Sequence, residues 1–424
     1  MKNGHLFFKV YLLLFLGLIL ISSLYSQDYQ SFRYELDYVL ENTKLRIGPF
    51  RIFPTFNFTD VGYDDNVYYQ REEDNPVSDY TATFSPKFKL YFLFLNKLIL
   101  SLTESPEYVY YYKEKRERRW NNTLSPEIKL LLLNRFVISG GYSYQDRRYR
   151  ASSEFDVRAN ELRESYKGSL FYETARRTSF GISTSSDKIS YEDITLPGEE
   201  IYLSRLLNRE EREGHLQFYY RVFSESLFFI SGGYTEYNFE HLQSQWRDSY
   251  SYQVFSGIRF PLLGRMRGAF SLGYRKFLTR EEGKKDFSGL VGNTSLALRI
   301  MRFDLRFQYV RDFRFSYWTD SIYYIEDRYG TGISFYLTRF LRLDYNYLYG
   351  ENKYPEITII QMPDGQFEEI KRKDIYRIHT AGFVLRIIKR TGVGITVNIW
   401  ERESNYYWAN RNKMFLGGYI TYEF

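Results

Sequence analysis

The side chains with the clearest chemical potential in this sequence are arginines that recur on one parity of alternating stretches, mostly close to short turns. Two acids, Asp304 and Asp344, share that parity. If those stretches enclose a pore, a ring of cationic side chains at its mouth attracts anions and repels cations. In a second interpretation the arginines pair with acids on neighbouring strands and leave little net field. The set comprises Arg51, Arg259, Arg265, Arg267, Arg299, Arg302, Arg306, Arg342 and Arg386.

Catalytic patterns are poorly represented. After the leader, the histidines of the chain are His215, His241 and His379. The sequence has no G-x-S-x-G, H-E-x-x-H or P-loop pattern, so neither an activated nucleophile nor a zinc centre has its usual arrangement. We therefore expect no enzymatic activity, no cofactor and no metal ion.

The composition favours a membrane interface. Aromatic residues make up 20% of the chain, with 43 Tyr and 36 Phe, and amphipathic rings are typical of membrane–water boundaries. Lys plus Arg, at 58, nearly balances Asp plus Glu, at 52, which is not the profile of a nucleic-acid-binding protein. A mean hydropathy of −0.46 excludes a bundle of membrane helices.

The N-terminus predicts export from the cytoplasm. Lys2 and Lys9 precede an apolar run over residues 10–21, and small residues follow up to Ser26. This pattern predicts a signal peptide over residues 1–26. Residues 27–45 form a short periplasmic segment with a loose helical pattern, which either contacts a periplasmic partner or sits in the lumen of the domain that follows. The absence of Cys excludes a disulfide framework and a lipoprotein anchor.

A hairpin repeat of roughly 40 residues runs through residues 46–424. Short breaks such as "FLFLNKLIL" and "LLLNRFVIS" alternate with longer polar segments at 61–78, 150–160, 190–206 and 350–371. Short turns at one end and long loops at the other predict an all-β, antiparallel up-and-down transmembrane barrel. We expect about 18 strands, with 16 as the alternative, the first at 46–60 and the last at 410–424. The short turns are then periplasmic and the long loops extracellular.

The alternation within the strands fits a barrel in lipid. Phe303, Leu305 and Phe307 share one face, while Asp304 and Arg306 share the other. Apolar residues outside and polar residues inside are the rule for a barrel that encloses water. A soluble β-sandwich also alternates, but its strands are commonly about 5 or 6 residues long. Strands of 12 or more residues therefore favour the membrane barrel.

The chain ends on an aromatic strand. Ile420, Tyr422 and Phe424 lie on one face of the last stretch, "MFLGGYITYEF". A closed barrel pairs its last strand with its first, because an unpaired edge is not tolerated in hydrocarbon. This ending resembles the C-terminal signal that the bacterial barrel-assembly machinery reads, so that machinery is an expected partner.

The first strand and loop carry a family resemblance. The order Tyr63-Asp64-Asp65-Asn66, then Ser78-Asp79, then Pro86 resembles the opening of the outer-membrane β-barrel porin 2 family. The resemblance implies a barrel of about this size, and its link to exopolysaccharide systems implies an exit port for a polysaccharide. The acids of this loop either ligate a divalent cation or favour the turn where the strand leaves the membrane.

These observations predict a channel in the outer membrane of a Gram-negative bacterium. Its expected partners are outer-membrane lipid, anionic solutes or acidic polysaccharide, and periplasmic export components, with no nucleic acid. The alternative is a structural or adhesive surface barrel that acts through its extracellular loops and transports nothing.

Overall fold

The computed structural model describes residues 31–43, 45–150, 152–154, 156, 158–174, 178–196, 199–222, 226–262, 266–318, 320–361, 365–388 and 391–423. The expected signal peptide over residues 1–26, together with Arg265 and Phe424, lies outside these residues.

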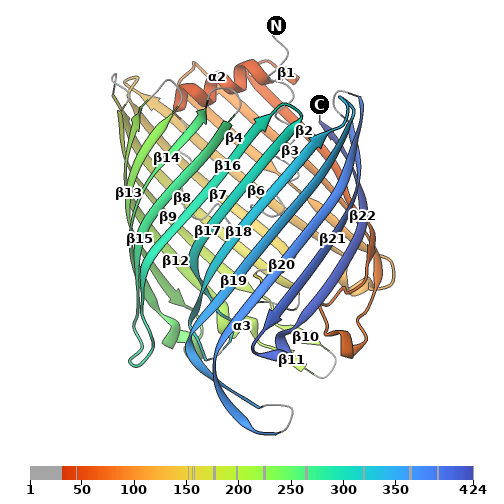
Figure 1. Ribbon diagram of the computed structural model, residues 1–424. Coiled ribbons are helices and arrows are strands. Elements are labelled where there is room, and N and C mark those ends of the chain that lie inside the picture. The colour runs from red at the N-terminus through yellow and green to blue at the C-terminus, as the bar shows by residue number, and fades with distance from the viewer. Residues whose placement is uncertain are drawn as a thin grey trace.

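The described chain forms a closed antiparallel β-barrel with 18 wall strands, as expected (Figure 1). The first wall strand pairs with the last, so that Phe56 lies opposite Tyr422 and Phe58 opposite Ile420. The wall strands are β2 (Phe50–Asp64), β3 (Asp79–Phe94), β4 (Leu98–Glu104) continued by β5 (Glu107–Tyr111), β6 (Arg119–Leu132), β7 (Phe136–Tyr149), β8 (Ala159–Glu173), β9 (Thr178–Tyr191), β12 (Arg209–Arg221), β13 (Leu227–Phe239), β14 (Ser249–Leu262), β15 (Met266–Thr279), β16 (Phe287–Ile300), β17 (Phe303–Phe315), β18 (Tyr323–Tyr336), β19 (Leu341–Gln361), β20 (Phe367–Ile388), β21 (Thr391–Ser404) and β22 (Arg411–Glu423).

Smaller elements lie at the two ends of the barrel. They are the helices α2 (Phe32–Asn42) and α3 (Leu203–Leu207), the short strands β1 (Leu45–Ile47), β10 (Ile194–Leu196) and β11 (Glu199–Ile201), and the 3-10 turns η3 (Glu72–Asp74), η4 (Lys115–Glu117), η5 (Leu242–Arg247) and η6 (Tyr407–Ala409). Among the described residues, no helix has the length and apolar character required to cross a membrane.

The alternating pattern orients the strands as expected. Phe303 and Phe307 of β17 are exposed on the outer surface, whereas Asp304 is paired on the inner surface. Met414, Leu416 and Ile420 likewise present an apolar outer face on β22. Successive side chains of a strand point to opposite faces, so one sequence parity faces lipid and the other faces the lumen.

Tight turns join the strands at one end. Leu95 and Asn96 have φ angles of 48° and 52°, and Leu133 and Asn134 have φ angles of 50° and 57°. Two consecutive residues with positive φ form the turn whose twist matches that of a β-hairpin. These turns coincide with the short breaks in "FLFLNKLIL" and "LLLNRFVIS", so the sequence located them correctly.

The prediction of a long loop at residues 350–371 is wrong. Residues 350–361 and 367–371 are not loop, because β19 and β20 continue as a paired ribbon that projects beyond the other strands (Figure 1). Their pairing is interrupted by a bulge between Lys353 and Ile357. Outside lipid, a strand needs no apolar face, so its polar sequence has the composition of a loop.

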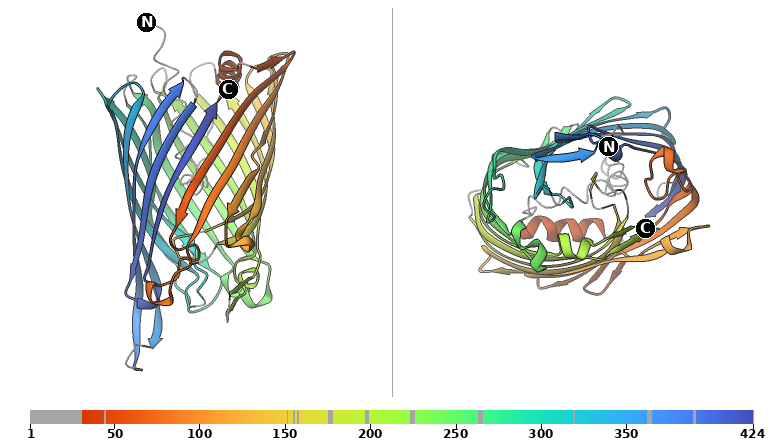
Figure 2. Two further views of the ribbon diagram at one scale, coloured as in Figure 1. Left: turned by 90° about the vertical axis from the view of Figure 1, so that its right-hand side faces the viewer. Right: turned by 90° about the horizontal axis from the view of Figure 1, so that it is seen from below.

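Helix α2 lies inside the barrel at the short-turn end (Figure 2). The hydroxyl oxygen of Ser31 caps α2 by accepting a hydrogen bond from the backbone N–H of Tyr34 at 3.3 Å. Phe32, Leu36 and Val39 are buried against inward-facing side chains of the wall. Of the two expectations for residues 27–45, the structure therefore shows the lumenal one for α2.

Candidate functional site in the barrel lumen

The predicted arginines and acids that the structure describes lie around the inner surface near the short turns. Arg51 lies opposite Tyr91, which is 2% exposed, and Arg259 lies over the ring of Phe229. Arg302 is an exception, because it belongs to the turn between β16 and β17 and donates to the carbonyl oxygen of Leu337. By strand register the inward set comprises Arg51, Arg259, Arg267, Arg299, Asp304, Arg306, Arg342, Asp344 and Arg386.

Some of these charges are paired. Arg299 lies 3.5 Å from Asp304, and Arg342 lies 2.6 Å from Asp344. Arg306 donates hydrogen bonds to Ser334 and Asn346. The two acids thus each neutralise one arginine, and the remaining arginines of the set outnumber them.

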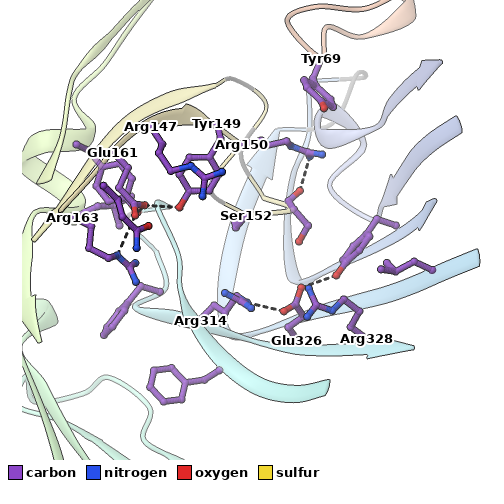
Figure 3. Close-up of a pocket in the computed structure, with 18 of the residues that line it drawn as sticks. Tyr69, Arg147, Tyr149, Arg150, Ser152, Glu161, Arg163, Arg314, Glu326 and Arg328 are labelled. Carbon is purple, nitrogen blue, oxygen red and sulfur yellow. Dashed lines mark hydrogen bonds and ion pairs between the residues drawn. The ribbon is translucent and has the colours of Figure 1, made fainter. Parts of the chain in front are cut away.

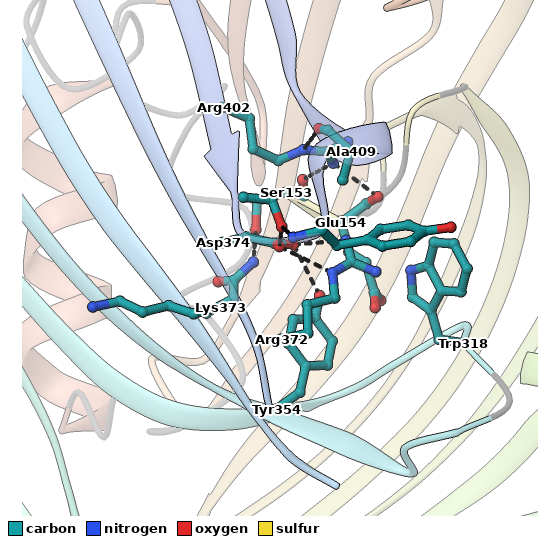
Figure 4. Close-up of polar contacts among 12 residues, drawn as sticks. Ser153, Glu154, Trp318, Tyr354, Arg372, Lys373, Asp374, Arg402 and Ala409 are labelled. Carbon is teal, nitrogen blue, oxygen red and sulfur yellow. Dashed lines mark hydrogen bonds and ion pairs between the residues drawn. The ribbon is translucent and has the colours of Figure 1, made fainter. Parts of the chain in front are cut away.

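Ser153 and Glu154, from the segment between β7 and β8, lie in the lumen against strands of the opposite wall (Figure 4). Arg402 of β21, which is 2% exposed, donates to the carbonyl oxygens of Ser153 at 2.9 Å and Glu154 at 3.0 Å. Asn352 of β19 donates to the hydroxyl of Ser153 at 2.8 Å. We call the described residues of this segment (150, 152–154, 156 and 158) the inserted loop, because its polar groups bind partners from strands on the far side of the barrel.

Charged contacts fix both ends of the inserted loop. The guanidinium carbon of Arg150 lies 4.5 Å from the ring centre of Tyr69 and 3.9 Å from that of Trp400. Burial lowers the pKa of Arg150 to about 10, so this residue stays cationic at neutral pH. Asp156 forms ion pairs with Arg402 at 2.5 Å and Arg411 at 3.0 Å. The loop is therefore held by charge and by cation–π contact at the same time.

The end of the β17–β18 hairpin also leans into the lumen. Phe313 packs with Phe277 of β15 and Phe287 of β16 in an aromatic cluster between the hairpin and the wall. The hydroxyl of Ser316 donates to the buried carboxylate of Glu154 at 2.6 Å. The hairpin and the inserted loop therefore support each other across the lumen.

A cavity of about 500 Å³ lies beside the inserted loop (Figure 3). We call it the loop cavity. Basic residues outnumber acidic ones in its lining, so its field favours anions. The basic residues are Arg147, Arg150, Arg163, Arg209, Arg314, Arg328 and Lys413, and the acidic residues are Glu161, Glu211, Glu213 and Glu326.

A second cavity, of about 540 Å³, is lined by Arg306, Arg342 and Asp344 of the predicted set. Pro86 of the predicted motif also lines it. Arg147 of β7 lines both cavities, so the two spaces adjoin at this side chain. The sequence interpretation missed Arg147 and Arg328, although their inward parity was available, because it concentrated on arginines near the short turns.

Inward aromatic residues near the short turns are covered by α2. Phe171 is 5% exposed and Phe229 is 6% exposed, and both pack in the cluster that contains Phe32 of α2. Phe255 packs partly against the same cluster. Rings buried in this way fill the lumen and do not offer a surface to a solute.

The acidic motif of the first loop binds the last strand. Asp64 accepts hydrogen bonds from the ammonium of Lys413 and the backbone N–H of Asn66, and Asp65 accepts one from the backbone N–H of Met414. Asn66 donates to the carbonyl oxygen of Asn412. The oxygens of Asp64 and Asp65 thus serve the junction between β2 and β22, which supports the structural interpretation of this motif.

The rest of the motif lies around this junction. Asp79 accepts hydrogen bonds from the backbone N–H groups of Lys113 and Glu114 at 2.9 and 2.8 Å, which joins the start of β3 to the next loop. The ring of Tyr63 packs against that of Tyr80, with 5.4 Å between their centres. Ser78 immediately precedes β3. Within the described residues, no cluster of three or more His, Asp or Glu side chains is arranged to hold a metal ion.

The histidines of the barrel have local partners. His215 faces the lumen 3.4 Å from Glu213. His379 faces outward, where its Nδ1 atom lies 3.0 Å from the hydroxyl of Tyr345. His241 caps η5 by accepting a hydrogen bond from the backbone N–H of Gln243. Each of these contacts is a structural one.

Comparisons with solved structures find distant similarities. The chain is similar to OccAB3 of Acinetobacter baumannii, with a TM-score of 0.49 and 10% identity over 89% of this chain and 100% of that chain. It is also similar to OccK3 (OpdO) of Pseudomonas aeruginosa, with a TM-score of 0.45 and 9% identity over 93% and 99% of the two chains. The siderophore receptor PirA of P. aeruginosa gives a TM-score of 0.43 and 9% identity over 90% and 81%.

The family of this chain is identified by its sequence. No curated protein matches it. Residues 41–412 match the family described as "Putative beta-barrel porin 2", which confirms the resemblance seen in the first loop. The chain therefore belongs to this family of porin-like barrels, and its place is the outer membrane.

Proposed function

We propose that this porin-like barrel is a narrow channel for small hydrophilic solutes. The observation that carries the proposal is the pair of polar cavities that adjoin at Arg147 inside a closed barrel. Pockets of about 300–1,000 Å³ suit small molecules, and both cavities fall in this range. The inserted loop and α2 reduce the space that an 18-strand wall would otherwise enclose.

Charge gives the proposed channel a preference for anions. The inward set near the short turns holds seven arginines and two acids, and the lining of the loop cavity is also basic. Walls of one predominant sign concentrate counter-ions of the opposite sign. We therefore expect anions to carry most of the current.

A role as the exit port of an exopolysaccharide system is the finer proposal that the family resemblance suggests. A basic lumen suits an acidic polymer. In the described conformation, however, a polymer strand meets the inserted loop and α2, so export requires both to move aside. Periplasmic export components are the partners that this role requires.

Planar-bilayer recording of the refolded chain from Gln27 onward tests these proposals. Open steps with anion preference, together with swelling of liposomes in small neutral sugars, support the narrow channel. Clear cation preference contradicts the role of the arginines. Conductance that acidic polysaccharide fragments block favours the exit port. Insertion without conductance favours a structural or adhesive barrel that acts through its loops.

A further inference from the structure

Most cations of the loop cavity have a carboxylate partner. Arg209 lies 2.7 Å from Glu211, and Arg163 lies 3.3 Å from Glu161. Lys413, at the edge of the cavity, lies 2.7 Å from Asp64. Paired charges of this kind contribute little net field to a solute in the cavity.

Arg147 and Arg328 are different. Within the described residues, neither side chain has a carboxylate oxygen within the 4.0 Å of an ion pair, and neither donates a side-chain hydrogen bond. The guanidinium carbon of Arg147 lies 5.5 Å from the ring centre of Tyr149. Both side chains line the loop cavity (Figure 3).

The acids nearest to these two arginines are already engaged. Glu161, opposite Arg147 in the strand register, accepts hydrogen bonds from the hydroxyls of Tyr149 and Tyr191 at 3.0 and 2.6 Å. It also lies beside Arg163. Arg147, Glu161 and Arg163 together therefore carry a net positive charge, and Glu211 of the neighbouring β12 also acts on Arg163.

The opposite wall repeats this arrangement. Glu326 accepts hydrogen bonds from Arg314 at 2.7 Å and from the hydroxyl of Tyr376 at 2.6 Å. Arg328 follows two residues later on the same strand and the same face. Arg314, Glu326 and Arg328 together therefore also carry a net positive charge.

Arg147 and Arg328 belong to opposite sides of the ring. β7 and β18 are the fifth and fourteenth of the 18 wall strands in the pairing order, so they are separated by half of the ring. A solute in the loop cavity thus lies between two guanidinium groups that approach from different directions.

We propose that Arg147 and Arg328 form a binding site for a small organic carboxylate that passes through the lumen. The inference rests on the proposed channel function and names the class of solute. A guanidinium group presents two parallel N–H donors that match a carboxylate, and such pairs are strong where water is limited. Two arginines on opposite walls select a molecule with two acidic groups. A cavity of about 500 Å³ limits that molecule to a small one.

The test uses succinate as the probe and two measurements. Calorimetric titration of the purified barrel in detergent reports binding whether or not the pore conducts. Bilayer recording reports whether succinate reduces the chloride current in a saturable way. We expect wild-type protein to bind succinate, and Arg147→Gln and Arg328→Gln each to weaken binding at least tenfold.

Lys167→Gln is the matched control. Lys167 faces the lumen from β8, on the parity of Glu161 and Arg163, but lines neither cavity. It removes one positive charge and should leave succinate binding unchanged. An equal loss of succinate binding in the control, or unchanged succinate binding in both arginine variants, contradicts the proposed binding site.

The two measurements separate this inference from the channel itself. If succinate binding depends on the arginines but the barrel does not conduct, the binding site is supported and the channel function is contradicted. If the barrel conducts and passes neutral sugars but binds no succinate, the channel function is supported and the binding site is contradicted. Thermal unfolding of each variant, monitored by circular dichroism, confirms that the barrel is intact.

Discussion

Lys413 of the last wall strand lies 2.7 Å from Asp64 of the first, and both side chains are almost completely buried. The pair closes the junction of the ring at its long-loop end, where Asp65 and Asn66 also bind β22. An ion pair in this position stabilises a contact between segments that are far apart in the sequence.

Breaking this pair should destabilise the barrel. Asp64→Asn leaves the ammonium of Lys413 buried without its partner, and removal of one member of a buried pair costs about 3–5 kcal/mol. Urea unfolding of the refolded protein in detergent measures the difference. Glu403→Gln, which removes the partner of Arg377 on an exposed surface, is the control and should change little. Equal stability of both variants would contradict a role for the junction pair.

Release of α2 should widen the lumen. Leu36 and Val39 are buried against the wall, whereas Tyr34 of the same helix is 62% exposed. An unpaired charge is costly in an apolar contact, so Leu36→Asp should detach the helix and raise the single-channel conductance. Tyr34→Asp places the same charge on the exposed face and should leave the conductance as it is.

Release of the inserted loop should make the current unsteady. Arg402→Gln removes the donors to the carbonyl oxygens of Ser153 and Glu154, and each buried carbonyl left without a partner costs about 1–3 kcal/mol. We expect larger and more frequent current fluctuations in single-channel records. Arg377→Gln serves as the control, because Arg377 pairs with the exposed Glu403. Steady records from both variants would show that the loop does not depend on Arg402.

Acid should hold the inserted loop more firmly. Burial raises the pKa of Glu154 above its ordinary 4.5, although Arg372 and the hydroxyl of Ser316 oppose the shift, and Asp374 adds to it. The docked loop therefore binds more protons than the undocked loop, so docking is favoured as the pH falls through the raised pKa towards 4.5. Current fluctuations should decrease on acidification in the wild type.

The variant Glu154→Gln isolates this effect. Its side chain is neutral at every pH, so the fluctuations should no longer respond to acidification. A response of the same size in the variant and the wild type would assign the pH dependence to another group.

Close packing between β19 and β20 predicts a specific intolerance. A Cβ atom on Gly350 would lie 2.0 Å from the ring of Tyr376, whose hydroxyl donates to Glu326. Gly350→Ala should therefore destabilise the barrel by about 1–3 kcal/mol, as overpacking does. Gly214→Ala, where nothing lies within 4 Å of the added atom, should be tolerated. Thermal unfolding measures both.

The sequence predicted the strands of the barrel wall better than the segments that lie inside the lumen. Strand parity followed from alternation, as at Phe303 and Asp304, because lipid and water impose opposite demands on the two faces. The sequence predicted a long loop at 150–160 but placed it outside the barrel, because Ser153 and Glu154 are polar whether they face solvent or Arg402. The projecting ribbon was mistaken for a loop for the same reason: outside lipid, Ile357 and Glu369 carry no alternating signal that separates strand from loop. Arg147 and Arg328 became distinct only when the partners of their neighbours were known.

The pairing of β2 with β22 also constrains the order of folding. Thr55 and Glu423 are neighbours in the sheet although almost the whole chain separates them, so this contact has the highest loop-closure cost in the wall. Hairpins such as β3–β4 can form as soon as their residues are available, but the ring remains an open sheet until the last strand arrives. A chain that stops before β22 would therefore expose two unpaired edges, and each edge is a template for association with another chain.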